Sequence, residues 1–213
     1  MIKYTDESFV AEYRQGRDCV SATLVTETLD FLKEKSASEA WTRYVDVGCG
    51  HAESSLRFVE QLPGWVKTLC CDVSAAQVDS AKQTFLDKPQ FKDRVEFAVC
   101  PAESLPLPDS SADLISCCVC FHWLDKDKFY AELKRVLKPG GVLAIMSYGF
   151  TKIDSDSWTR VQVENFYNPL IQYFESVLAV DDPEVVAWAK QFKYILNGYE
   201  GLELPFPESK SIK

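Results

Sequence analysis

The 213-residue chain lacks any apolar run long enough to span a bilayer, and it has only two histidines. Its longest apolar stretch, Leu114–Phe121, is much shorter than the roughly 20 residues that a membrane helix needs. The first residues, MIKYTDESF, lack the apolar core of a secretory signal. No basic cluster occurs and the net charge is −9, which argues against nucleic acid as the main partner. These absences predict a cytoplasmic protein that binds neither membranes nor nucleic acids.

Eight cysteines are present, most of them inside or at the ends of apolar segments. Without an export signal, such cysteines are expected to be small buried thiols rather than disulfides. Neither histidine lies at ligand spacing from the other, so we expect no metal site. Cys49 differs from the rest because it falls in a glycine turn, where it would lie beside a ligand at the start of a helix.

Strand-like and helix-like segments alternate along the first two thirds of the chain. The predicted strands are Arg43–Val47, Val66–Cys71, Arg94–Val99, Asp113–Cys120 and Val142–Tyr148. The predicted helices are Arg17–Lys35, Ala52–Leu62, a helix that Ser74 and Gln77 begin with a capping box, and Asp125–Leu137. Such alternation predicts an α/β fold with a doubly wound, mostly parallel sheet.

The most informative stretch is YVDVGCGHA, residues 44–52, together with the acidic end of LCCDVS at Asp72. The first predicted strand runs directly into Gly48 and Gly50, where a ligand can approach bare backbone as the next helix begins. The second strand ends at Asp72, whose carboxylate can accept hydrogen bonds from a ribose diol. The two features together predict a nucleoside-binding crevice.

The residues around the glycine turn favour a cationic ligand over a dinucleotide. A dinucleotide fingerprint would place a third glycine where this chain has Glu53, and Asp46 adds a second carboxylate nearby. Both acids would repel a pyrophosphate, but they suit the sulfonium and ammonium groups of S-adenosylmethionine. A nicotinamide-dependent reductase is the alternative that this pattern disfavours.

Five segments in order resemble the Rossmann-like (class I) S-adenosylmethionine-dependent methyltransferases, in the methyltransferase type 11 group. They are VDVGCG (45–50), Asp72, AESLPLPDSSADLI (102–115), FHWLD (121–125) and RVLKPGGVLAI (135–145). The HW pair, the opening F-x-x-x-Y-R (9–14) and the tail from Tyr194 are similar to the trans-aconitate methyltransferase-like branch. Two departures are Ala52 in place of a third glycine and Pro101 in place of an aspartate.

The resemblance implies a sheet with strand order 3-2-1-4-5 and S-adenosylmethionine as cofactor, with S-adenosylhomocysteine as product. It implies a cofactor-binding domain at residues 1–148, including an N-terminal cap helix, and a helical acceptor-side lobe at residues 149–213. The residues expected to bind the cofactor are Asp46, Gly48, Cys49, Gly50, Asp72, Val73, Ala102, Glu103, Tyr13 and Arg14.

The aromatic-rich segments Ser155–Val180 and Pro183–Leu196 read as helices, and no strand-like segment follows them. The family's closing antiparallel strand pair is therefore expected to be missing. An unpaired fifth strand would offer an exposed edge through which a homodimer can form.

The acceptor is expected to be a small molecule, and in the resembling branch such acceptors are carboxylic acids. A carboxylate is already a nucleophile, so it needs a cation to hold it rather than a base; Arg14, Arg17, Arg160 and Lys193 are candidates. Trp123, Tyr148 and Trp158 are candidates for the pocket wall, or they are core aromatics. His122 is either a catalytic base or a packed histidine. An amine, phenol or thiol acceptor, and cofactor binding without turnover, stay open as alternatives.

Overall fold

The computed structural model of the protein describes residues 20–147, 172, 176, 199 and 202–210. Contacts group residues 2–146 and 204–213 into one unit, and Met1 with residues 147–203 into another. The first unit contains the whole sheet and nearly all described residues. In the second unit, Gln172 and Ser176 are helical. The rest of the two helices predicted after residue 154 lies outside the described residues.

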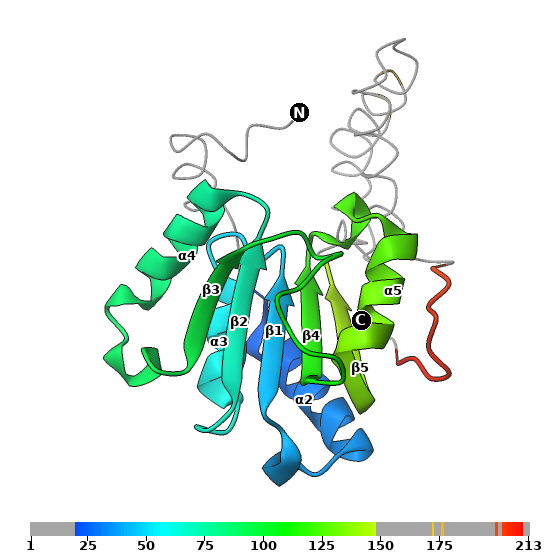
Figure 1. Cartoon of the computed structure of the whole chain (residues 1–213), viewed down its shortest axis with the longest axis horizontal. Helices are drawn as coiled ribbons and strands as arrows, with labels where there is room; N and C mark the ends of the chain where they lie inside the picture. The colour runs from blue at the N-terminus through cyan, green and yellow to red at the C-terminus, as the bar shows by residue number, and fades with distance from the viewer. Residues whose placement is uncertain (1–19, 148–171, 173–175, 177–198, 200–201, 211–213) are drawn as a thin grey trace, which may run out of the picture. The chain divides into compact units, whose positions relative to one another are not determined.

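Five parallel strands form one sheet in the order β3-β2-β1-β4-β5, which confirms the predicted fold and strand order (Figure 1). The strands are β1 (Arg43–Val47), β2 (Lys67–Asp72), β3 (Val95–Val99), β4 (Ala112–Cys118) and β5 (Leu137–Met146). The helices are α2 (Ala22–Lys35), α3 (Glu53–Gln61), α4 (Ala75–Leu86) and α5 (Lys126–Val136), with short 3-10 turns η1 (Ser38–Ala40), η2 (Pro89–Phe91) and η3 (Phe121–Trp123). Figure 1 shows α3 and α5 on opposite sides of the sheet.

The core on the α3 side of the sheet consists of two apolar clusters. One joins α2 and α3 to β1, β4 and β5, and in it the rings of Tyr44 and Phe58 lie 5.0 Å apart. The other joins α3 and α4 to β2 through Leu56, Val59 and Ala81. Strands β1 and β4 are buried almost throughout, as expected for central parallel strands covered on both faces.

The helix predicted at Arg17–Lys35 begins later than predicted. Ser21 has an extended backbone, and its hydroxyl accepts a hydrogen bond from the Leu24 N–H at 3.2 Å, so α2 starts at Ala22 rather than at Arg17. The C-terminal segment 204–210 contacts the same helix, because Lys35 pairs with Glu208 and Lys210 pairs with Glu27.

Strands β4 and β5 also differ from their predicted bounds. β4 ends at Cys118 instead of Cys120, because Val119 takes a positive φ of 52° that extended chain cannot continue. β5 begins at Leu137, five residues before the predicted start. Leu137 pairs with Ala112 and Val142 pairs with Leu114, so the intervening Lys-Pro-Gly-Gly segment forms an irregularity within the strand.

The proline-rich connection from β3 to β4 contains no regular helix, as predicted, and a single arginine holds it. The Arg135 guanidinium donates to the carbonyls of Leu105 and Leu107, at 3.1 and 2.7 Å, and to the carboxylates of Asp109 and Glu132. Glu132 in turn accepts from the Leu105 N–H at 2.6 Å. The loop therefore has a defined path although it lacks secondary structure.

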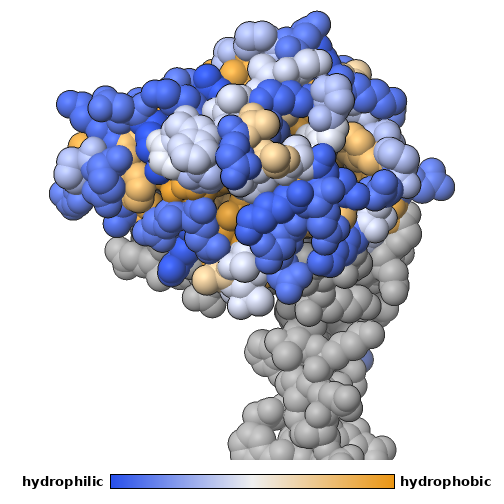
Figure 2. Space-filling view, turned by 90° about the horizontal axis from the view of Figure 1, so that it is seen from below, coloured by the Kyte–Doolittle hydropathy of each residue, from blue (hydrophilic) through white to orange (hydrophobic). Residues whose placement is uncertain are grey.

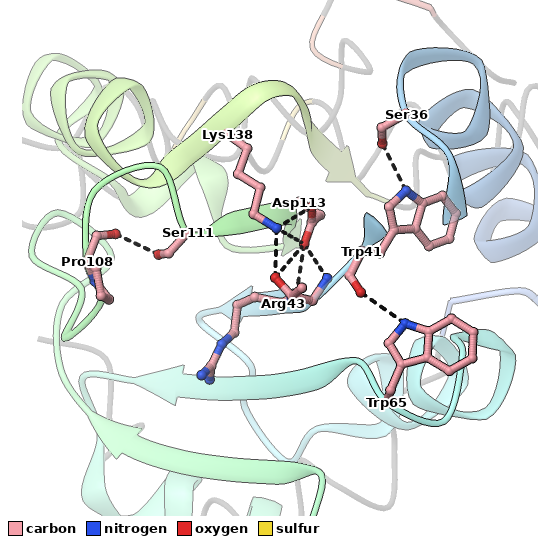
Figure 3. A network of polar contacts seen from close by, with 9 residues as sticks. Ser36, Trp41, Arg43, Trp65, Pro108, Ser111, Asp113 and Lys138 are labelled. Carbon is pink, nitrogen blue, oxygen red and sulfur yellow. Dashed lines mark hydrogen bonds and ion pairs between the residues drawn. The ribbon is translucent and has the colours of Figure 1, made fainter. Parts of the chain in front are cut away.

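One buried carboxylate, that of Asp113, links the N-terminal ends of several strands (Figure 3). Asp113 Oδ2 accepts from the backbone N–H groups of Thr42 and Arg43, at 2.7 and 2.8 Å. The Lys138 ammonium donates to both Asp113 oxygens, at 2.8 and 2.9 Å, and to the Thr42 hydroxyl. Asp113 thus joins the starts of β1, β4 and β5.

The surface at the N-terminal ends of the strands is mostly hydrophilic, and only small apolar areas interrupt it (Figure 2). Within the described parts of the chain, no helix is long and apolar enough to cross a membrane.

Replacing Asp113 should destabilise the fold. In Asp113→Ala, two backbone N–H groups and the Lys138 ammonium lose their acceptor, and we expect a loss of about 2–4 kcal/mol in the free energy of unfolding. Urea denaturation measures this loss. Asp30→Ala is the control, because Asp30 is an exposed residue on α2 that pairs with Lys33; its effect should stay within about 0.5 kcal/mol. Equal effects of the two substitutions would contradict this role of Asp113.

Candidate functional site

The turn after β1 has the geometry that the glycine motif predicts. Gly48 and Gly50 have φ values of 60° and 54°, in the left-handed region that favours glycine. A Cβ atom at Gly48 would lie 2.7 Å from Cys120 Cβ, so no larger residue fits there. At Gly50 a Cβ atom would meet, among the described residues, only Gln77 Oε1, at 3.6 Å. The two glycines thus have different roles: Gly48 packs closely against Cys120, and Gly50 leaves space for a ligand.

Asp72 lies against this turn, as predicted from the sequence. One carboxylate oxygen accepts from the Gly50 N–H at 3.1 Å, and the other accepts from the Ser74 N–H at 2.9 Å. Burial raises the pKa of Asp72, and the backbone hydrogen bonds oppose that rise. The carboxylate therefore sits at the end of β2 with its position fixed by two backbone donors.

The capping box predicted at the start of α4 forms only in part. The Ser74 hydroxyl accepts from the Gln77 N–H at 3.3 Å, as predicted. The reciprocal bond is absent because the Ser74 N–H donates to Asp72 instead. Gln77 is 3% exposed, and its side-chain Oε1 has no hydrogen-bond partner in the structure. A buried acceptor without a donor is costly, so this atom is a candidate to bind a ligand group.

Asp46 lies in the interior of the sheet rather than at the surface of the turn. Its oxygens accept from the hydroxyls of Ser55 and Ser116, at 2.5 and 2.6 Å, and the Tyr44 hydroxyl lies 2.7 Å from that of Ser116. Burial raises the pKa of Asp46 to about 6, against the opposing effect of the two serines. Direct or water-mediated binding of an ammonium group by Asp46 stays a prediction.

Val73 and Val99 expose apolar side chains on either side of Asp72. They are 70% and 56% exposed, and Val99 is the register partner of Asp72. The Cys100 N–H donates to the Asp72 carbonyl at 3.0 Å, which starts the proline-rich loop at this point. Val73 thus has the exposure needed to pack on a base.

The two loop residues expected at the adenine edge differ in exposure. Ala102 is buried, and Glu103 is half-buried with one oxygen accepting from the Asp125 N–H at 2.9 Å. That bond connects the loop to the start of α5. Glu103 therefore holds the loop in place, in addition to its predicted role at the adenine edge.

The acceptor-side candidates are described only in part. His122 is 2% exposed and its ring lies 5.1 Å from that of Trp123, which is 42% exposed. The burial of His122 fits the packed alternative better than the catalytic one. Tyr13, Arg14, Tyr148 and Trp158 lie outside the described residues, as do Arg17, Arg160 and Lys193.

Several residues near the site were not foreseen. Ser55 and Ser116 are the partners of Asp46, and the signal for Ser116 is a single hydroxyl in the apolar run that follows Asp113 in β4. Cys117 and Cys120 have Cys-x-x-Cys spacing, and their sulfur atoms lie 2.9 Å apart. No group of three potential metal ligands occurs among the described residues.

Known proteins resemble this chain in sequence and in fold. Residues 45–145 match the family model described as "Methyltransferase domain". A solved structure of a putative type II methyltransferase from Anaeromyxobacter dehalogenans is 30% identical, with a TM-score of 0.65, over 92% of this chain and 70% of that one. The chain belongs to the class I S-adenosylmethionine-dependent methyltransferases.

Two curated relatives also match this chain in sequence. A putative methyltransferase from Dictyostelium discoideum is 30% identical over 76% of this chain and 53% of its own length. The ubiquinone/menaquinone biosynthesis C-methyltransferase UbiE of Hahella chejuensis is 28% identical over 67% of this chain and 57% of its own length. The chain thus spans about half the length of the curated relatives it matches.

The residues of the site fit S-adenosylmethionine, the cofactor of this family. Gln77 Oε1 offers a buried acceptor beside Gly50, and the Asp72 carboxylate adds acceptors at the end of β2. Glu53 lies in the first turn of α3, where a dinucleotide would need to place its phosphates. The local charge therefore suits a cationic adenosine derivative and disfavours a pyrophosphate.

The raised pKa of Asp46 predicts a distinct pH dependence of stability. Because the folded-state pKa of about 6 exceeds the ordinary value of 3.8, the folded protein keeps this proton to higher pH than the unfolded chain. The contribution of Asp46 to the free energy of unfolding should fall by up to about 3 kcal/mol as the pH rises from about 4 to about 6.

Asp46→Asn removes this titration, so its stability relative to the unmodified protein should increase over that pH range. Urea denaturation at both ends of the range measures the difference. Asp79→Asn is the control, because Asp79 is exposed on α4 beside Lys82. A stability difference for Asp46→Asn that does not change with pH would contradict the assignment.

Proposed function

We propose that this protein transfers the methyl group of S-adenosylmethionine to a small-molecule acceptor, and that the acceptor is a carboxylic acid. The observation that carries the proposal is the junction of the glycine turn with Asp72, where the Gly50 N–H donates to the carboxylate at 3.1 Å. This bond brings the bare backbone of the turn and the acidic end of β2 into one site. Family membership supports the chemistry.

In this proposal each described residue has a separate task in holding the cofactor. Asp72 accepts hydrogen bonds from the ribose hydroxyls, because each of its oxygens keeps acceptor capacity beyond its one backbone donor. Val73 packs on the adenine, and Ala102 and Glu103 border its edge. Gln77 Oε1 accepts from a polar hydrogen of the ligand, and Asp46 supplies negative charge beneath the turn.

A carboxylate acceptor suits the chemistry that these residues can support. Bound S-adenosylmethionine supplies an electrophilic methyl group, and a carboxylate oxygen can attack it without losing a proton. The protein's tasks are then to align the two reactants and to exclude water, rather than to provide a base. The buried state of His122 agrees with a reaction that uses no histidine base. The likeness to the trans-aconitate methyltransferase-like branch supports the same acceptor class.

A second candidate acceptor is an amine, phenol or thiol. His122 lies just beyond β4, at the edge of the sheet that carries Asp72, and it would be the base that such an acceptor needs. His122→Gln distinguishes the two: esterification of an acid should persist in this variant, whereas methylation of a phenol or amine should fall.

The acceptor class can be tested with labelled cofactor. We expect transfer of label from methyl-labelled S-adenosylmethionine to members of a panel of small di- and tricarboxylic acids, as base-labile methyl esters. Mass spectrometry of the products identifies them. Label found only on amines, phenols or thiols would support the second candidate. Cofactor binding without any product from acids, amines, phenols, thiols or a metabolite extract would contradict the proposed enzyme activity.

Asp72 provides the sharpest test of cofactor binding. Asp72→Ala removes a charge-assisted hydrogen-bond acceptor worth about 1.5–3 kcal/mol, so the affinity for S-adenosylmethionine should fall roughly ten- to a hundredfold. Isothermal titration calorimetry measures the affinity, and circular dichroism checks that the variant is folded. Asp79→Ala, which also removes one carboxylate, from the exposed face of α4, should bind normally. Unchanged binding by folded Asp72→Ala would contradict the site.

A further inference from the structure

Two cysteines at the end of β4 lie close together because the chain reverses there. The sequence is Cys117-Cys118-Val119-Cys120, and Val119 has a φ of 52°, which is unusual for a β-branched residue. The Val119 N–H donates to the Met146 carbonyl of β5 at 2.8 Å, which holds the turn. The result is a distance of 2.9 Å between Cys117 Sγ and Cys120 Sγ. We call these two residues the dithiol pair.

The dithiol pair also contacts the glycine turn. Cys120 Sγ donates to the Val47 carbonyl at 3.0 Å, immediately before Gly48. A Cβ atom built on Gly48 would lie 2.7 Å from Cys120 Cβ and 2.8 Å from its sulfur. Because Cys120 fills the space below Gly48, a change in its position must be transmitted to the turn.

The geometry of the pair is close to that of a disulfide. A disulfide bond is about 2.05 Å long, so the sulfur atoms need to approach by less than about 1 Å. We propose that Cys117 and Cys120 form a redox-sensitive dithiol, that a peroxide oxidant converts it to an intramolecular disulfide, and that this weakens cofactor binding at the Gly48 turn. The last part rests on the proposed function, and the disulfide itself does not.

The oxidation proceeds in two balanced steps. A thiolate of the pair attacks one oxygen of hydrogen peroxide, and the O–O bond breaks to give a sulfenic acid and hydroxide. The second thiolate attacks the sulfenic sulfur, which forms the S–S bond and releases a second hydroxide. The two thiol protons convert both hydroxides to water. The first step is expected at Cys120, which is 9% exposed whereas Cys117 is fully buried.

The surroundings of the pair make this reaction slow at neutral pH. Its hydrogen bond with Cys117 and its burial both raise the pKa of Cys120, and burial raises that of Cys117. The negative charges of Asp46 and Asp72 act in the same direction on Cys120. Since the thiolate is the reactive form, the oxidation is best followed at mildly alkaline pH.

A second pair of thiols competes with the dithiol pair for oxidation. Cys71 and Cys100 share a hydrogen bond that lowers the pKa of Cys100 and raises that of Cys71. Cys100 is half-buried, so reagents reach it more easily than they reach the dithiol pair. The experiment must therefore locate the disulfide rather than only count thiols.

Differential alkylation of the 213-residue chain locates the disulfide. The protein is oxidised with hydrogen peroxide, unfolded and blocked with N-ethylmaleimide, then reduced and labelled with iodoacetamide, and tandem mass spectrometry identifies the residues that carry the second label. We expect this label on Cys117 and Cys120 in the unmodified protein and in Cys118→Ser, which is the matched control. The label should be lost from both positions in Cys117→Ser and Cys120→Ser. Second label confined to Cys71 and Cys100, or absent, would overturn the proposal.

The effect on the site is measured separately by calorimetry of the oxidised and reduced protein. We expect weaker binding of S-adenosylmethionine after oxidation, recovery after dithiothreitol, and no such change in Cys120→Ser, whose folding is checked by circular dichroism. If the disulfide forms and affinity is unchanged, the coupling to the turn is wrong. If the reduced protein does not bind the cofactor at all, the proposed function fails, whereas the mapped disulfide still stands.

Discussion

The hydrogen bond from the Gly50 N–H to Asp72 is the interaction on which the candidate site depends. It joins the turn after β1 to the end of β2, and Asp72 uses its other oxygen to bind the Ser74 N–H at the start of α4. One carboxylate therefore positions three segments that a ligand would contact. Parallel pairing of β1 with β2 makes this possible, because it brings the carboxyl ends of both strands to the same edge.

The buried carboxylates at the two ends of the parallel strands have different partners. At the edge where the strands begin, Asp113 is paired with the Lys138 ammonium, which compensates its charge. Beneath the glycine turn, Asp46 accepts from two serine hydroxyls and has no ion pair with any described residue, so burial raises its pKa to about 6. The first arrangement stabilises the fold, whereas the second leaves negative charge near the place where a cationic cofactor is proposed to bind.

The sequence predicted the approximate positions of the strands because apolar runs and glycine turns are local signals, whereas the strand order came from the resemblance to the methyltransferase family. It also predicted that Asp72 would lie near the glycine turn. It missed Ser116 as a partner of Asp46, since a hydrogen bond between residues 70 positions apart depends on strand register. The incomplete capping box has a local cause: Asp72, two residues before Ser74, competes for the same N–H group. The close approach of Cys117 and Cys120 required a backbone conformation at Val119 that its residue type disfavours.

The way in which the loop between β3 and β4 is held allows its exposed side chains to change. Arg135 holds this loop through the main-chain oxygens of Leu105 and Leu107, which every amino acid possesses. Exchanges at its exposed positions, such as Ser104 or Pro106, leave those anchor points in place. New side chains at these positions would therefore leave the sheet unaltered, while the arginine itself has no equivalent substitute because lysine cannot span the same acceptors.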